Sequence, residues 1–413
     1  AMHERASRAL RDCTPEDDTR GRAELELAEA KMAFAFGNLA ESYAAGESAL
    51  ALSRSVRDEA GAARALCTLA QVEAHRGHLS AADALFDEAL QTAKRAEDPQ
   101  LEELALSSGW TIAYQRRDMQ GCRSLGERYL ELAIKLGDRP AEAQAHGRLG
   151  ITLAVTGSEY TSARRHYADA ARIFVETGRP VGSAGPLLNE ALLEMKLGFF
   201  DRATAATEKA KQLFEEAGDE RGLVGALNNL VFLRALTGKL GAAHEAAEKG
   251  LKLARRHGFQ LLEAAIVENQ ALAEGLAGNY ARAVEIAQPL FELRRRSESE
   301  VWLSSILANL AIWHAALGDI PSARGAVNQL LADEDAIMRT MDWPSYCYWA
   351  AAQVFRLDER ETEAEAALDR ARRLVDDAAK ELGPEDREQF LKIPWHDDVM
   401  EAASRGSWPS PPR

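Results

Sequence analysis

Cysteine, proline and aromatic residues are scarce in this sequence. Only 4 cysteines and 13 prolines occur among 413 residues, and aromatic side chains make up 7%. The four cysteines, Cys13, Cys67, Cys122 and Cys347, lie far apart and form no Cys-x-x-Cys pair. That spacing argues against a disulfide framework and against a cysteine zinc site. We therefore expect a reducing, cytoplasmic setting.

Long apolar runs and an excess of basic residues are also missing. No stretch approaches the roughly 18 consecutive apolar residues of a membrane span, so no membrane partner is expected. The chain has 50 Lys and Arg against 65 Asp and Glu, a formal net charge of −15 that repels nucleic acid. Two basic runs, Arg255-Arg256-His257 and Arg294-Arg295-Arg296, fall where helices should end, where cations offset the helix dipole. No direct nucleic-acid partner is expected.

Turn residues that end helices recur at a nearly fixed interval. The steps between them are 40 residues, with a single step of 41. Apolar residues between the turns follow helical spacing, so each unit reads as helix, turn and second helix. One such pair cannot bury both its faces, so neighbours must stack into an all-α solenoid of about nine pairs. The turns begin at Gly37, Gly77, Arg117, Gly157, Gly198, Gly238, Gly278, Gly318 and Asp358.

Small residues occupy the fifth position after most of these turns. A small side chain there allows two helices to approach closely, so we expect these residues in the core. They are Ala82, Cys122, Ala203, Ala243, Ala283 and Ala323, with Ala163 and Ala364 displaced by one.

The repeat resembles a known family. The pattern running from Leu310-Ala311 through Gly318-Asp319-Ile320 to Ala323 is similar to the tetratricopeptide repeat. The resemblance covers roughly residues 21–382 and implies a right-handed superhelical solenoid with a concave, ligand-binding face. The 40-residue period is longer than the usual 34. Repeats with such long helices resemble the sensor arrays of MalT-like bacterial regulators.

Four segments are expected along the chain. Residues 1–20 form an N-terminal helix or lead-in, 21–382 the solenoid, 383–406 a capping helix, and 407–413 a disordered, Pro-rich tail. The cap is expected because the last repeat of any solenoid has an open face that must be covered.

Two prolines fall inside expected helices. Pro186 lies in the first helix of the fifth repeat and Pro289 in the second helix of the seventh. Each should shorten or kink its helix.

Tryptophan is concentrated at the C-terminal end. Six of the seven tryptophans lie beyond residue 300, and a homodimer through this part of the chain remains open. They are Trp302, Trp313, Trp343, Trp349, Trp395 and Trp408.

Catalytic and cofactor motifs are missing. The sequence has no phosphate-binding loop, nucleophile elbow, zinc-protease motif or calcium loop, so we expect no enzyme, no cofactor and no metal. His75 and His78 flank a turn without ligand partners nearby at suitable spacing. An enzyme would become the better hypothesis only if titratable side chains such as His146, His314 and Glu268 converged.

Asparagine recurs at one position of four successive repeats. Asn189, Asn229, Asn269 and Asn309 each lie nine residues before a turn glycine. Asparagine is a poor helix former, which suggests that the amide is used. By the family resemblance this position borders the concave groove, where an amide can pair with a peptide backbone. The alternative is a structural ladder between neighbouring helices, and both interpretations stay open.

The expected ligand site surrounds these asparagines. It comprises the four asparagines with Asn228, Phe232, Leu192 and Glu268, beside Leu188, Leu272 and Ile312. We expect a non-catalytic module that binds a peptide or protein segment on its concave face, within a bacterial signalling or transcription regulator. The alternative is a domain that senses a small-molecule effector in the same cavity. A closed pocket around Asn229 and Phe232 would favour the effector, and an open groove the peptide.

Overall fold

The computed structural model describes residues 18–35, 37–157, 159–296, 303–410 and 412, and this part of the chain is helical without a strand. The all-α prediction is confirmed. The lead-in helix expected over residues 1–20 lies almost wholly outside the described residues, as does Trp302.

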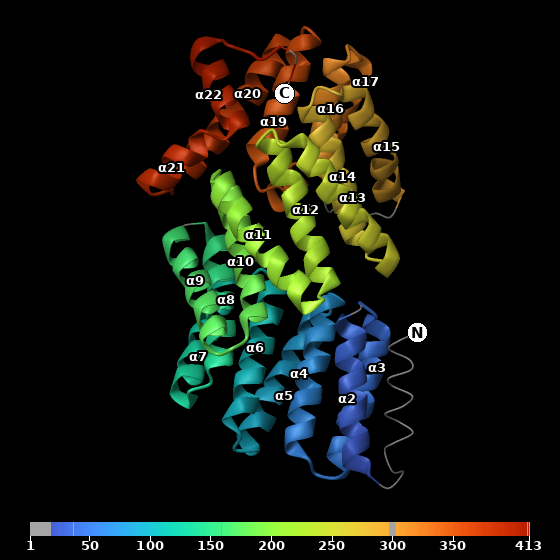
Figure 1. Cartoon of the computed structure of the whole chain (residues 1–413), viewed down its shortest axis with the longest axis vertical. Helices are drawn as coiled ribbons and strands as arrows, with labels where there is room; N and C mark the ends of the chain where they lie inside the picture. The colour runs from blue at the N-terminus through green and yellow to red at the C-terminus, as the bar shows by residue number, and fades with distance from the viewer. Residues whose placement is uncertain (1–17, 36, 158, 297–302, 411, 413) are drawn as a thin grey trace. The chain divides into compact units, whose positions relative to one another are not determined.

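The chain divides into two compact units, Ala1–Pro180 and Val181–Arg413, where the sequence predicted one uninterrupted array. Figure 1 shows the first unit in blue to green and the second in green to red. The first unit contains four helix pairs: α2 (Thr19–Ala35) with α3 (Leu39–Ser55), α4 (Glu59–His75) with α5 (Leu79–Arg95), α6 (Pro99–Gln115) with α7 (Met119–Leu136), and α8 (Arg139–Thr156) with α9 (Tyr160–Glu176).

The second unit contains five further pairs and a C-terminal extension. After the 3-10 turn η1 (Pro180–Ser183) come α10 (Ala184–Leu197) with α11 (Phe200–Ala217), α12 (Glu220–Leu236) with α13 (Leu240–His257), α14 (Gln260–Leu276) with α15 (Tyr280–Arg296), α16 (Leu303–Ala316) with α17 (Ile320–Leu331), and α19 (Pro344–Leu357) with α20 (Glu361–Lys380). The short α18 (Glu334–Thr340) precedes α19, and α21 (Pro384–Leu391) and α22 (Pro394–Arg405) follow α20. The prediction of about nine pairs is confirmed.

The turns within a helix pair and the turns between pairs are built from the same residue types. A residue with left-handed backbone ends one helix, and it is glycine at most turns but Arg57, Glu97, Arg117 or Glu359 at four. An aspartate that caps the next helix often follows and accepts a hydrogen bond from a backbone N–H of the first turn, which satisfies an otherwise unpaired donor. The capping aspartates are Asp58, Asp98, Asp118, Asp138, Asp219, Asp319 and Asp333.

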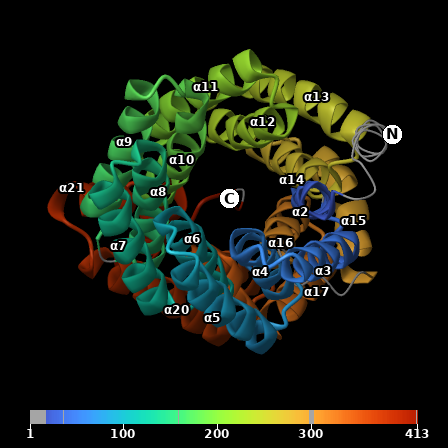
Figure 2. The same cartoon turned by 90° about the horizontal axis from the view of Figure 1, so that it is seen from below.

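The predicted small residues lie where helices cross. Each of the eight is at most 1% exposed, which confirms the expectation that they let helices pack closely. Within each unit, several first helices of successive pairs also contact one another, as α4 does α6 and α12 does α14. In Figure 2 these first helices lie to the inside of the second helices. We call the surface that they present the inner face.

The two prolines have different effects. The first helix of the fifth repeat is shortened as predicted: α10 begins at Ala184, after η1, and has 14 residues. The other helix, α15, runs for 17 residues through Pro289 and is not shortened.

The C-terminal end differs from the predicted single cap. Two helices, α21 and α22, take its place, and α22 packs on α19 and α20 while α21 contacts α20 and α10. The expected disordered tail has no regular secondary structure over residues 407–410. Its Trp408 ring nevertheless stacks on Trp349, with ring centroids 5.2 Å apart, and Arg356 lies over it.

Candidate functional site

The four repeated asparagines lie on the first helices of four successive pairs of the second unit, α10, α12, α14 and α16. Two of them are used within the protein. The Nδ2 of Asn269 donates to the Oδ1 of Asn228 at 3.0 Å, which links α14 to α12. The Oδ1 of Asn309 accepts from the hydroxyl of Tyr346 at 2.8 Å, and Asn309 is buried. At these two repeats the geometry is that of a structural ladder.

The side-chain amides of the other two asparagines have hydrogen-bonding groups that are not used within the described part of the protein. Asn189 and Asn229 are half-buried. Within the described residues, the side chain of Asn189 makes no hydrogen bond, and that of Asn229 only accepts a long one, 3.4 Å from the Nδ2 of Asn228. The amide groups that a ligand can reach are therefore those of α10 and α12.

Glycines make room beside these amides. Gly185 and Gly225 lie four residues before Asn189 and Asn229, on the same helix face. A Cβ added at either glycine would meet no atom within 4 Å. Each unspent amide therefore borders an open strip of backbone. Leu192, three residues after Asn189, is 48% exposed and adds an apolar contact.

Glu268 is not a free groove residue. Its carboxylate accepts from Nη1 of Arg294 at 2.9 Å and from the Ser305 hydroxyl. Burial raises its pKa, and the bonds from Ser305 and Arg294 oppose that rise. Arg294 lies near the end of α15, as the sequence predicts for its basic run, but it is buried at 7% exposure. The pair fixes the end of α15 against α14 and α16.

Phe232 is covered by an aromatic residue from the C-terminal part. Its ring stacks on Trp343, with centroids 6.1 Å apart and planes 12° from parallel. Trp343 also meets Trp395 edge-on at 5.0 Å, and its indole N–H donates to the Lys196 carbonyl oxygen at 3.1 Å. The start of α19 is therefore fastened to the end of α10, in a closure that sequence reasoning missed.

Helix α21 completes this closure at the turn after α10. The side-chain amide of Gln389 donates to the Gly198 carbonyl oxygen at 2.8 Å, and Arg202 pairs with Glu385 at 2.6 Å. A Cβ on Gly198 would lie 2.7 Å from a side-chain carbon of Ile393. The cap thus covers the first repeat of the second unit as well as the last. We call the contacts of Trp343, Gln389 and Ile393 with α10, Gly198 and Phe232 the closing contact.

Other expected groove residues are less accessible. Ile312 is 2% exposed and belongs to the core, so its expected place on the groove is wrong. Leu188 and Leu272 are half-buried and pack against core clusters. None of the five described tryptophans beyond residue 300 is exposed, so the structure gives no support to a dimer through them.

The three residues that could have indicated catalysis do not converge. The Nδ1 of His146 lies 2.8 Å from that of His166, His314 pairs with Asp319 at 3.4 Å, and Glu268 binds Arg294. Burial lowers the pKa of His166 to about 4. No group of three His, Cys, Asp or Glu side chains suited to a metal ion occurs in the described ranges.

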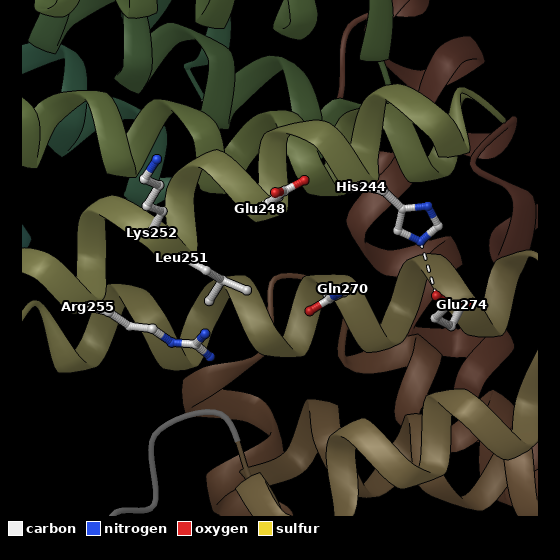
Figure 3. A pocket seen from close by; sticks show the side chains of 7 residues that line it. All are labelled: His244, Glu248, Leu251, Lys252, Arg255, Gln270 and Glu274. Carbon is white, nitrogen blue, oxygen red and sulfur yellow. Dashed lines mark hydrogen bonds and ion pairs between the residues drawn. The ribbon is translucent and has the colours of Figure 1, made fainter.

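Another hollow is lined by other residues of the second unit. Figure 3 shows it between α13 and α14, with a cavity volume of about 700 Å³. His244 Nε2 and Glu274 Oε1 meet across it at 3.1 Å. Basic, acidic and apolar side chains are mixed in its lining, which favours no single ligand chemistry. The lining residues are His244, Glu248, Leu251, Lys252, Arg255, Gln270 and Glu274.

The inner face of the first unit is polar, which sequence reasoning did not recognise. Gln71 donates to the Ser108 hydroxyl at 3.0 Å, joining α4 to α6. Arg148 donates to Ser107 at 2.7 Å and to Thr111 at 3.2 Å, joining α8 to α6. A signal was present, because Ser108 and Arg148 occupy the same place before their turns as the asparagines do.

Solved structures with the same arrangement of helices share the fold at low identity. The STAND (signal transduction ATPase with numerous domains) protein with a tetratricopeptide repeat sensor from Pyrococcus horikoshii aligns with a TM-score of 0.54 and 17% identity, over 72% of this chain and 44% of that one. A Rap protein complexed with competence and sporulation factor gives 0.54 and 12%, over 84% and 99%. NprR in complex with its cognate peptide NprX gives 0.52 and 14%, over 81% and 98%.

Sequence comparison gives the family. No curated protein matches the chain significantly. In the described residues, none of the helices is both long and apolar enough to cross a bilayer. The family model described as anaphase-promoting complex subunit 5 matches residues 22–76, 62–117, 182–237 and 270–340, together more than half of the chain. The matches recur along the repeats, so the chain is a tetratricopeptide-like repeat protein and belongs to this family.

Proposed function

We propose that the protein is a non-catalytic, cytoplasmic interaction module that binds an extended peptide on the inner face of its second unit, within a signalling or transcription regulator. One observation carries the proposal. Asn189 and Asn229 present unspent amides at the same position of neighbouring helices, each beside a glycine that leaves room for a chain. We call these two amides and the open backbone beside them the peptide track.

The chemistry of the amide fits a peptide backbone. One asparagine side chain offers two N–H donors and a carbonyl acceptor, so it can pair with both groups of a peptide unit. An amide that is half-buried without a partner costs little while water reaches it and gains a bond when a ligand replaces the water. Leu192, exposed on the same face, supplies an apolar contact for a ligand side chain.

Two of the similar structures contain ligands. One is described as bound to a cognate peptide and another as complexed with competence and sporulation factor. Both share the fold with this chain at 12–14% identity. They support the proposal as examples of this architecture holding a ligand, and the residues that hold it here are argued from this chain alone.

A small-molecule effector is the second candidate. It is favoured by the closing contact, in which Trp343 stacks on Phe232 and covers one edge of the inner face. A compact apolar ligand beside Phe232 would act on the position of Trp343. The similar protein with a tetratricopeptide repeat sensor supports this reading, again through the fold alone.

The experiment blocks the proposed peptide track with a larger side chain. Gly225→Leu places a side chain beside Asn229, and because a Cβ there meets no atom, folding should be unaffected. The matched control is Gly241→Leu on α13, an exposed helical glycine that is also open. Wild type and both variants are screened by thermal unfolding against a library of blocked ten-residue peptides and a metabolite library.

We expect a peptide that raises the unfolding midpoint of wild type and Gly241→Leu but not of Gly225→Leu. The double variant Asn189→Ala, Asn229→Ala should lose at least tenfold in affinity, with Asn328→Ala on α17 as the matched control. A metabolite with the same dependence would replace the first candidate by the second. Ligands that bind all variants equally would place the site elsewhere.

A further inference from the structure

Arg148 is a half-buried cation that is held without a carboxylate from the described part of the chain. The protein has 65 acidic residues against 50 Lys and Arg, so carboxylate partners are abundant. Arg116, Arg123 and Arg139 of the same unit each pair with one. Among the described residues, Arg148 lies within ion-pair distance of none. The groups whose charge affects its pKa are Tyr129 and Cys122, neither of which is a carboxylate.

The guanidinium is held in a fixed plane. Its Nη2 donates to the Ser107 hydroxyl at 2.7 Å and its Nη1 to the Thr111 hydroxyl at 3.2 Å. Its central carbon lies 4.7 Å from the ring centroid of Trp110, which supports it by a cation–π contact. All three supporting residues belong to α6, and Arg148 belongs to α8. A guanidinium has five N–H donors, so three remain available for a ligand.

The surface beside Arg148 is open. The residue is half-buried and lies on the inner face, nine residues before the turn glycine Gly157. Its neighbour Gly147 would accept a Cβ with no atom within 4 Å. Burial lowers the pKa of Arg148 without discharging it, because the pKa of an arginine starts so high.

A purely structural link between α6 and α8 does not need a charge. Ser107 and Thr111 could bond a neutral amide, as Asn269 does Asn228 in the second unit, and leave no cation to desolvate. A cation that is preorganised by neutral hydroxyls and an aromatic ring, without a carboxylate, is instead suited to an external oxyanion. The planar fork matches a carboxylate or a phosphate with two parallel bonds.

We propose that Arg148, positioned by Ser107, Thr111 and Trp110, is an oxyanion-binding subsite on the inner face of the first unit. It takes a carboxylate or phosphate group of a ligand that lies along this face. The subsite is separate from the peptide track of the second unit, and neither proposal depends on the other.

The test measures binding of two free oxyanions, inorganic phosphate and acetate, to the full chain. Each is titrated by calorimetry at constant ionic strength, with chloride as the compensating ion. The variants are Arg148→Gln, which removes the charge and keeps much of the length, and Arg123→Gln on α7, a matched control with the same change in net charge. Arg148→Lys keeps the charge but loses the planar fork.

We expect saturable millimolar binding of at least one anion to wild type and to Arg123→Gln. Arg148→Gln should weaken it at least tenfold, and Arg148→Lys by threefold or more. Phosphate binding without acetate binding would assign the natural group as a phosphate, and the reverse as a carboxylate. If neither anion binds wild type up to 50 mM, or if Arg148→Gln binds as wild type does, the proposal is wrong.

A second variant covers the case in which Arg148→Gln does not fold. Ser107→Ala with Thr111→Val keeps the guanidinium and removes the hydroxyls that orient it. Its affinity should fall threefold to tenfold, and unchanged affinity would overturn the positioning role. Asn229→Ala should leave anion binding unaffected, so a failed peptide track is distinguishable from a failed anion subsite.

Discussion

The two units are built from the same repeat but differ in what their inner faces present. At the position nine residues before the turn, the first unit has Ser108 and Arg148, where the second has Asn229. Three residues further on, Thr111 in the first unit corresponds to Phe232 in the second. The helices and turns of the two units follow the same rules. At these two positions of the repeat, the first unit presents hydroxyl groups and a guanidinium, and the second presents an amide and a phenyl ring.

The units also differ in how their ends are finished. In the second, α21 and Trp343 return to the turn after α10, so residues 147 and 191 positions apart are hydrogen-bonded. In the first unit, hydrogen bonds such as those from Gln71 to Ser108 and from Trp110 to Thr152 link neighbouring repeats. The closing contact adds long-range contacts to an architecture in which repeats otherwise contact their nearest neighbours. It should make unfolding of the second unit more cooperative.

Breaking the closing contact should have the largest effect. Trp343→Ala removes the stack on Phe232, the edge contact with Trp395 and the bond to the Lys196 carbonyl, and should cost about 3 kcal/mol of unfolding free energy. Urea unfolding would measure it, and faster trypsin cleavage near α21 would locate it. Trp408→Ala is the control, since Trp408 packs on Trp349 instead. Equal losses in the two variants would mean that closure contributes nothing specific.

The second largest effect is expected from glycine-to-alanine substitutions at the turns. Gly198 and Gly157 both have left-handed backbone, at φ +86° and +81°, so alanine costs about 1–2 kcal/mol at either. Only at Gly198 does the new Cβ also fall 2.7 Å from Ile393, which should add about 1–3 kcal/mol. Gly238→Ala, with nothing within 4 Å, should resemble Gly157→Ala. Chemical denaturation of the three variants tests this order.

Acidification should weaken the C-terminal cap through His396. This side chain is fully buried between the Ser345 hydroxyl and the Phe390 carbonyl, and burial lowers its pKa from 6.5 to about 4. The unfolded chain therefore binds a proton at a higher pH than the folded one, and stability falls as pH drops below 6.5 towards 4.

Between pH 7 and pH 5 the loss should be about 2 kcal/mol. His396→Gln should remove this part of the pH dependence, as followed by urea unfolding at several pH values. His166, whose pKa is also lowered to about 4, should give the stability of the first unit a similar dependence on pH. A slope that is unchanged in His396→Gln would contradict the assignment.

The smallest effect concerns the open glycines of the inner faces. Gly225→Ala in the second unit and Gly147→Ala in the first place a Cβ in free space within a helix. Each should stabilise its unit by about 0.5–1 kcal/mol, because alanine loses less backbone entropy than glycine. Thermal unfolding measures both. A loss of stability at Gly225 would mean that the strip is filled, and would weaken the peptide proposal.

Sequence reasoning recovered the repeat but only part of the site. The turns and the small residues such as Ala203 follow from local rules, since a left-handed turn and a close helix crossing tolerate few residue types. The recurrence of Asn229 and its counterparts on the first helices follows from the same periodicity. Asn309 and Glu268 were expected to face a ligand, yet Tyr346 and Arg294 occupy them, from helices 37 and 26 residues away. No local pattern reveals those partners.

The sequence by itself determined the all-helical fold, the number of helix pairs and the helices that carry the asparagines, because each depends on periodicity and turn chemistry within about 40 residues. The tertiary structure decided the division at residue 180, the return of α21 to Gly198, the burial of Arg294 and the isolation of Arg148. These depend on which side chains meet when helices from different repeats pack, and such meetings are set by the accumulated geometry of the whole stack.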